Sequence, residues 1–189
     1  MEYHLTTPVT AAELAPLRAG DTVYLSGVVY TARDAAHARL CALLENGEPS
    51  PYPLEGSAVY YVGPTPERPG MPIGAAGPTT SGRMDSFSPM LLDRGQKIMI
   101  GKGARSAAVR DAIVRNGAVY LGAVGGAGAA MAGAVCSSEI VCWPDLGCEA
   151  VRRLEVEDFP LTVIIDAQGN DLYEVGPRRY LESLSNPSE

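Results

Sequence analysis

The sequence predicts an α/β protein with a mixed sheet flanked by helices. Strand-like and helix-like patterns follow one another along the chain, which predicts this class. Of the 189 residues, 46% are hydrophobic and 20% are charged, which predicts that the chain folds around a core. The composition is typical of a globular protein and the length is near that of one domain, so we expect residues 1–189 to form a single domain.

The first part of the chain predicts a helix, a strand and a second helix. Residues Thr10–Glu13 have the spacing of a capping box, which opens a short helix, and the apolar run 21–30 is typical of a strand. Thr31 is the expected cap of the next helix, which Gly47 ends, so Arg33 is expected in its first turn. Arg33 therefore follows directly on a strand.

A long loop is expected in the middle of the chain. After a proline-marked surface loop and a strand over residues 58–62, residues 63–82 contain too many glycines and prolines for a regular element. Loops of this length in compact domains are usually functional or disordered. This one ends in the sequence Gly77-Pro-Thr-Thr-Ser-Gly-Arg83.

The remaining elements are predicted from periodicity and turn residues. The expected helices cover residues 84–94, 106–116 and 125–134. The expected strands cover residues 96–100, 118–124, 140–143, 151–156 and 161–165. The last strand is expected to turn through 166–170 into a hairpin with 171–175, and residues 182–189 are expected to be a frayed tail.

Charge and hydropathy argue against nucleic-acid and membrane partners. The net charge is −7 and no run of Lys and Arg exceeds two residues, which argues against a nucleic-acid partner. The start lacks the pattern of a signal peptide and no apolar stretch reaches the roughly 18 residues of a membrane span, so we expect a cytoplasmic protein without a membrane partner. Its four cysteines are expected to be reduced thiols.

Three positively charged residues follow predicted strands. Arg33, the loop that ends at Arg83, and Lys102 each come after a strand, and ligands of such sheets favour the carboxyl ends of strands. Two guanidinium groups and an ammonium suit a small dianion, because they bind carboxylates through charge-assisted hydrogen bonds. The alternative is that each cation is a separate surface residue.

Other residues have an ordinary structural interpretation beside a functional one. His37 lies one helical turn after Arg33 and either orients a carboxylate or packs in the protein. Asp85 either supports the site or pairs with a nearby cation or caps a helix. Cys136, Cys142 and Cys148 recur every six residues but form no CxxC pair, so buried thiols are expected rather than metal ligands.

Several longer motifs, in the same order, resemble a known family. They are Thr31-Ala-Arg-Asp-Ala-Ala-His-Ala-Arg39, Tyr61-Val-Gly-Pro-Thr-Pro66, Gly77-Pro-Thr-Thr-Ser-Gly-Arg-Met-Asp85, Gly101-Lys-Gly103 and Glu155-Val-Glu-Asp-Phe-Pro160. Over residues 25–173 the chain resembles the β subunits of class I fumarase and L-tartrate dehydratase, and the C-terminal domain of single-chain class I fumarases.

This resemblance implies a β/β/α swivelling domain that closes over a [4Fe–4S] cluster held by a separate α subunit, with no cluster ligand in this chain. It implies reversible dehydration of a C4 dicarboxylate, in an assembly of two α and two β chains. By motif, Arg33, Arg83 and Lys102 match the binders of the substrate carboxylates. Thr79 matches the proposed catalytic base, and Thr80 beside it is a further substrate contact or an alternative base.

Two alternatives to a fumarate hydratase β subunit remain at this point. An L-tartrate dehydratase β subunit would use the same cations, because tartrate is also a C4 dicarboxylate, and the contact to its extra hydroxyl is not identified by the sequence. A non-catalytic dicarboxylate-binding module would reuse the fold without the reaction, because fold alone does not determine function.

Overall fold

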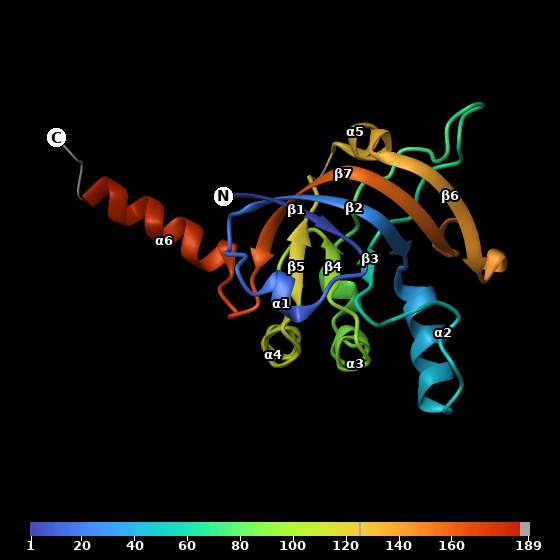
Figure 1. Ribbon diagram of the computed structural model, residues 1–189, viewed down its shortest axis with the longest axis horizontal. Coiled ribbons are helices and arrows are strands. Elements are labelled where there is room, and N and C mark those ends of the chain that lie inside the picture. The colour runs from blue at the N-terminus through green and yellow to red at the C-terminus, as the bar shows by residue number, and fades with distance from the viewer. Residues whose placement is uncertain (125, 186–189) are drawn as a thin grey trace.

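A computed structural model describes residues 1–124 and 126–185 of the chain (Figure 1). Within these residues, seven strands form one mixed sheet. The strands are β1 (Glu2–Thr6), β2 (Thr22–Thr31), β3 (Ala58–Tyr60), β4 (Ile98–Gly101), β5 (Val119–Gly122), β6 (Val135–Cys142) and β7 (Val151–Ile165). The helices are α1 (Ala11–Leu14), α2 (Asp34–Glu45), α3 (Ser88–Asp93), α4 (Ala107–Asn116), α5 (Gly128–Gly133) and α6 (Leu172–Ser185), with 3₁₀ turns η1 (Ser81–Met84) and η2 (Pro144–Glu149). The predicted α/β class with a mixed sheet is confirmed.

The two longest strands close most of the sheet on itself. The strand order is β1-β2-β3-β4-β5-β7-β6, and β2 also pairs with β7. Strands β2, β3, β4 and β5 are parallel neighbours in turn, whereas β7 runs antiparallel to both β2 and β5. The carboxyl ends of β2, β3 and β4 therefore lie along one rim.

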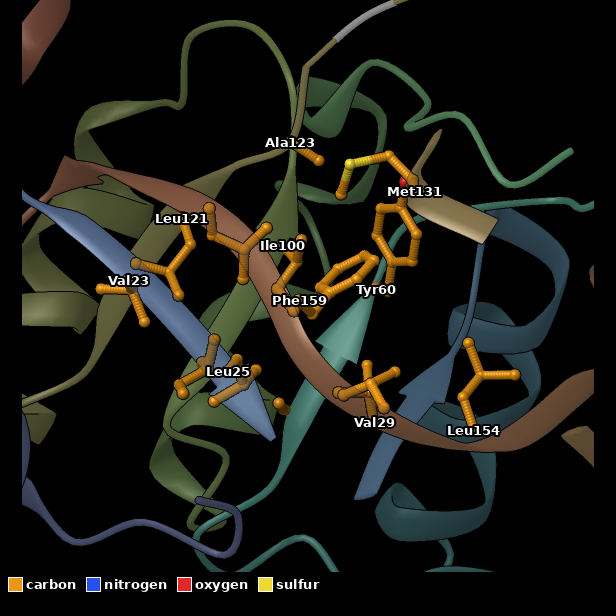
Figure 2. Packing of buried hydrophobic residues seen from close by; sticks show 14 of the residues in the cluster. Val23, Leu25, Val29, Tyr60, Ile100, Leu121, Ala123, Met131, Leu154 and Phe159 are labelled. Carbon is orange, nitrogen blue, oxygen red and sulfur yellow. The ribbon is translucent and has the colours of Figure 1, made fainter. Parts of the chain in front are cut away.

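Alternating side chains of β3, β4 and β5 build two separate cores. Tyr60, Ile100 and Leu121 face the interior of the curved sheet, where they pack with Phe159 of β7 (Figure 2). The residues between them point to the other face, against α2, α3 and α4, which lie together on one side of the sheet in Figure 1. Because both faces are covered, β3 and β4 are buried along their whole length, as is usual for parallel sheets.

Two predicted helix boundaries are confirmed and one is wrong. Thr10 and Glu13 form the capping box at α1, and α4 begins after Ser106 and ends at Gly117, whose positive φ of 57° suits a residue without a side chain. Thr31 does not cap α2: Arg33 occupies the N-cap position. Thr31 is instead the buried last residue of β2. Its hydroxyl donates a hydrogen bond to the Ala150 carbonyl and accepts one from the backbone N–H of Arg152.

Of the predicted hairpin after residue 165, the turn and one antiparallel bridge between Ile165 and Asp171 are present, but the second strand is wrong. Residues 172–185 form α6, and strands predicted separately at 151–156 and 161–165 are one strand, β7. The Asp171 carboxylate accepts a hydrogen bond from the backbone N–H of Tyr173, 2.9 Å away, and Glu174 lies three residues after Asp171. This is the spacing of a helix start, a signal that the β-rich composition of the segment obscured.

The expected frayed tail and the expected small-residue helix fall partly outside the described residues. Residues 182–185, expected to be frayed, are the last turn of α6, while residues 186–189 lie outside the described residues. Residue 125, the expected start of the small-residue helix, also lies outside them, and α5 begins at Gly128. No helix in the described part of the chain has the length and apolar character needed to cross a lipid bilayer.

Candidate functional site: a cationic rim at the ends of three strands

The structure brings the sequence-predicted site residues to the same rim of the sheet. The segment Thr79–Arg83 runs across the carboxyl ends of β3 and β4: the Thr79 N–H donates to the Tyr61 carbonyl, 2.8 Å away, and the Ser81 N–H donates to the Lys102 carbonyl, 2.9 Å away. Thr80 and Lys102 form an isolated parallel bridge. We call this edge, with Arg33, Thr79, Thr80, Arg83 and Lys102, the cationic rim.

Arg33 lies at the start of α2, directly after β2. Its guanidinium is 3.4 Å from the Glu149 carboxylate, and its side chain is 20% exposed. Its Nε is buried and has no hydrogen-bond partner within the described residues. The guanidinium packs against Gly63, and a Cβ at that position would have to displace the end of the Arg33 side chain.

Arg83 projects from the 3₁₀ turn η1 and is 48% exposed. Its Nε donates to Oδ1 of Asp34 at 2.9 Å, and its Nη2 is 2.7 Å from Oδ2 of the same carboxylate. Asp34 is the first residue of α2, immediately after Arg33. The two rim arginines are therefore joined through adjacent residues of one helix start.

Lys102 follows β4 and is exposed. Its backbone N–H donates to the Ser81 hydroxyl at 3.0 Å, which fixes the chain beneath it. Within residues 1–124 and 126–185, no acceptor lies within hydrogen-bonding or ion-pair distance of its ammonium. Its charge is thus available to a ligand.

The rim carries less net positive charge than its three cations suggest. Arg33 faces Glu149 and Arg83 faces Asp34, so three cations and two carboxylates leave a formal charge of +1. Like charges held close together repel, and these carboxylates offset that repulsion in the absence of a ligand. The arginines are held by partners within the chain, which spacing in the sequence did not indicate.

Thr79 and Thr80 lie between the cations. Thr79 is half-buried and Thr80 is exposed, and the Thr80 side chain makes no capping bond to η1. The next residue, Ser81, is fully buried, and its hydroxyl accepts a hydrogen bond from the Tyr120 hydroxyl at 2.9 Å. Gly101 leaves the space that the Ser81 side chain fills. The loop that carries the threonines is thereby anchored to β4 and β5.

A buried arginine that sequence reasoning missed supports the same loop from below. The Arg105 side chain is 0% exposed; its Nε donates to Asp85 at 2.7 Å and its Nη2 to the Ser88 hydroxyl at 2.7 Å. Its guanidinium also packs against the rings of Tyr61 and Tyr120. Burial opposes its charge, but Tyr61 and Asp85 outweigh that effect and raise the pKa of Arg105 above its usual value.

Asp85 is the carboxylate for which the sequence left two roles open. It pairs with Arg105, and its second oxygen accepts from the Ser106 N–H at 2.6 Å, at the start of α4. It therefore joins the end of the rim loop to α4. The sequence did not indicate that Arg105 is buried, because arginine side chains are normally exposed to solvent.

His37 lies in the core beneath the rim. It is fully buried, and its Nδ1–H donates to the Arg33 carbonyl at 2.9 Å, since a carbonyl oxygen can only accept. The ring packs against Tyr61 and Phe87, and its Nε2 has no partner within the described residues. Burial, the largest cause, lowers the pKa of His37 to about 4.

This pKa predicts a loss of stability in mild acid. The unfolded chain protonates His37 near its ordinary pKa of about 6.5, whereas the folded protein resists protonation until about pH 4. Stability from this residue is therefore complete above about pH 6.5 and decreases as pH falls toward 4, by up to roughly 1.4 kcal/mol per pH unit. Urea unfolding from pH 7 to 4.5 should show this slope, and His37→Gln should flatten it. His4→Gln provides the control for loss of a histidine, because the His4 side chain is exposed.

The cysteines differ from the expectation of buried thiols. All four are free; Cys41 is buried and Cys142 half-buried, but Cys136 and Cys148 are exposed. The reason is that β6 is an edge strand with most of its residues in solvent, and η2 has no buried residue. Burial raises the pKa of Cys41 and of Cys142 to about 11. In the described residues, no group of three or more His, Cys, Asp or Glu side chains converges as a metal site.

The fold and the rim define a class: an α/β domain with cationic side chains at the carboxyl ends of its parallel strands. The chain belongs to the fumarase C-terminus family, whose sequence model matches residues 1–176. The family predicted from the motifs is thus confirmed.

Named relatives agree with this membership. The chain is 40% identical to fumarate hydratase 2 of Leishmania major, over 85% of this chain and 29% of that protein. It is 41% identical to the aerobic class I fumarate hydratase of Escherichia coli K12, over 86% of this chain and 30% of that protein. It is 34% identical to the L(+)-tartrate dehydratase subunit beta of E. coli K12, over 96% of this chain and 92% of that subunit. The chain spans about three tenths of the fumarate hydratases, and these relatives are hydro-lyases by name.

Proposed function

We propose that this chain is the β subunit of an iron–sulfur hydro-lyase that interconverts fumarate and malate. The observation that carries the proposal is the cationic rim: Arg33, Arg83 and Lys102, from three separate segments, lie along the carboxyl ends of adjacent parallel strands. Their side chains suit a substrate with two carboxylates, because each cation forms charge-assisted hydrogen bonds with carboxylate oxygens.

In this proposal the two substrate carboxylates bind to the rim cations. When malate is dehydrated, Thr79 removes a proton from one of the two central carbons and the hydroxyl leaves the other. A hydroxyl is a weak base until another group takes or shares its proton. Nearby cations favour the deprotonated form of Thr79, and we assign the proton acceptor to a carboxylate of the partner subunit. Thr80, exposed beside it, is a further contact to the substrate.

The cofactor and the partner are part of the same proposal. The described residues of this chain do not fit a [4Fe–4S] cluster, because no group of ligating side chains converges among them. We therefore assign the cluster and its ligands to an α subunit that packs over the rim, in an α2β2 assembly in the cytoplasm. Similarity to a protein named as a subunit beta supports a partner chain. The cluster supplies Lewis-acid chemistry at the substrate hydroxyl.

L-tartrate is the alternative substrate. The similarity to the tartrate dehydratase subunit beta extends over nearly all of both chains, which favours this alternative. Identity favours fumarate, since it is 40–41% with the fumarate hydratases and 34% with the tartrate dehydratase subunit. The same cations serve both substrates, so discrimination depends on contacts to the additional hydroxyl.

The test is an anaerobic assay of the complex. This chain is co-expressed with a candidate α subunit encoded beside it, the complex is purified without oxygen, and turnover of fumarate, malate and L-tartrate is measured. We expect kcat/KM to be highest with fumarate and malate. Preference for tartrate would replace the proposed substrate, and a complex inactive with all three would overturn the hydro-lyase function.

Lys102→Ala is expected to weaken substrate binding. Loss of one charge-assisted contact of about 1.5–3 kcal/mol should raise KM for malate roughly 10- to 100-fold. The effect should decrease at high salt, because the contact is exposed and therefore screened. The control is Lys97→Ala: Lys97 is the other lysine of the chain and donates to the Asn116 carbonyl, away from the rim. A normal KM in the Lys102 variant would contradict its assignment.

A further inference from the structure

The ion pair between Arg83 and Asp34 uses only one edge of the guanidinium. Asp34 contacts Nε and Nη2, which is the side edge of the group. Nη1 and the second hydrogen of Nη2 form the end edge, which has no partner within the described residues and belongs to a side chain that is 48% exposed. A guanidinium has five N–H donors in a fixed plane, so the end edge can still bind a carboxylate through two bonds.

Other arginines of the chain bind their carboxylates through either edge of the guanidinium. Arg39 binds Asp145 through Nη1 and Nη2, which occupies its end edge. Arg115 donates hydrogen bonds to Asp93 from both Nε and Nη2 and is similarly exposed, but it lies at the end of α4 rather than at the rim. Arg83 donates one hydrogen bond to Asp34 from Nε, and its Nη2 makes only an ion-pair contact with Oδ2. The Arg115–Asp93 pair therefore uses the same edge of the guanidinium at a different location.

Asp34 is held more firmly than the arginine it binds. It is the first residue of α2, a helix fixed to the sheet by buried Ala36, Leu40 and Leu44, and a carboxylate at a helix N-terminus is stabilised by the helix dipole. The backbone of η1 is anchored through buried Ser81 and Met84, but the Arg83 side chain itself is long and 48% exposed. The rigid helix start thus sets the orientation of the arginine side chain, which otherwise has many rotamers.

We propose that Asp34 is a positioning residue: it holds Arg83 by its side edge so that the end edge binds one carboxylate of the substrate. This inference rests on the proposed function, in which Arg83 is a substrate contact. Asp34 does not touch the substrate and acts only through Arg83. Orientation of a binding group in advance matters for the rate, because small misplacements of reacting groups reduce it strongly.

Asp34→Ala should separate kcat from KM. We expect kcat for malate to fall about ten-fold or more, because Arg83 loses its fixed orientation. KM should not rise, because removal of one carboxylate changes the formal rim charge from +1 to +2 and favours a dianion. Asp34→Glu should restore part of the rate, whereas Asp34→Asn, which presents an N–H group to Nη2, should not. Asp93→Ala is the matched control and should have wild-type kinetics.

The decisive experiment is chemical rescue of the Arg83→Ala complex by free guanidinium ion. If Asp34 holds the guanidinium of Arg83, guanidinium chloride at low millimolar concentration should bind to Asp34 and restore part of the lost activity. The double variant Asp34→Ala/Arg83→Ala should show no rescue, and without guanidinium it should be no slower than Arg83→Ala alone. A role of Asp34 in folding alone would not produce this dependence.

The outcomes separate the two proposals. An active wild-type complex in which Asp34→Ala has normal kcat, or in which guanidinium rescues both variants equally, would overturn the positioning role and leave the proposed function intact. A wild-type complex with no activity on fumarate, malate or tartrate would overturn the proposed function and this inference with it.

Discussion

Arg83→Ala is expected to lower kcat/KM for malate by about 100-fold or more, because the side chain supplies a two-bond, charge-assisted contact worth at least about 3 kcal/mol. The fold should be little affected. Arg83 is about half exposed, and exposed ion pairs such as its pair with Asp34 contribute roughly 0–1 kcal/mol to stability. Activity of the complex and its urea unfolding should therefore respond very differently to this substitution.

Arg115→Ala provides a close control for this result. Its guanidinium binds one aspartate through the same two nitrogens and is 47% exposed, but it is not on the rim. Both variants should have similar unfolding free energies, and only the Arg83 variant should lose activity. Full activity after Arg83→Ala would remove Arg83 from the site, and equal losses in both variants would point to a general structural effect.

Arg105→Met is expected to cause a large loss of stability. It replaces a fully buried guanidinium by an apolar side chain and leaves the Asp85 carboxylate, 18% exposed, without its cation. Breaking one side of such a buried pair costs about 3–5 kcal/mol. Urea or thermal unfolding of the purified protein should measure this loss. The Ser88 hydroxyl loses a partner as well, although it keeps its own bond to the Met84 carbonyl.

The double variant Arg105→Met/Asp85→Asn tests the cause. An asparagine can still accept the hydrogen bond from Ser106 but carries no charge, so the double variant should recover about 1 kcal/mol or more of the loss. Arg115→Met, on the surface, should cost less than about 1 kcal/mol. A loss from Arg105→Met as small as that would mean that the buried pair contributes nothing beyond packing.

The sequence predicted the location of the candidate site residues better than it predicted the residues around them. Arg33, the Thr79–Arg83 segment and Lys102 each follow a strand, and the parallel order of β2, β3 and β4 brings them to one rim, as expected from the alternation of strands and helices. The ion-pair partners Asp34 and Glu149 were not predicted as partners, because Glu149 lies far along the chain from Arg33. Ion pairing between residues so far apart in the sequence depends on the fold and not on their spacing along the chain.

The errors in secondary structure have a similar origin. Residues 171–175 were predicted as a strand because they contain Tyr173 and Val175, but the capping pattern at Asp171 instead begins helix α6. Strand β7 continues through Pro160 because the strand pairs with β2 along most of its length, despite the positive φ of 45° at Asp158. Such pairing outweighs the breaker signals of the segment.

The sequence by itself determined the fold class, the family and the set of rim cations, because these follow from periodicity, from strand–helix order and from long motifs that need no knowledge of contacts. The tertiary structure alone decided how those cations are held: Asp34 and Glu149 reduce the charge of the rim, and Arg105 lies buried beneath it. The physical reason is that burial and ion pairing depend on contacts between residues distant in sequence. The identity of a charged residue does not by itself show whether its side chain lies in solvent or in the core.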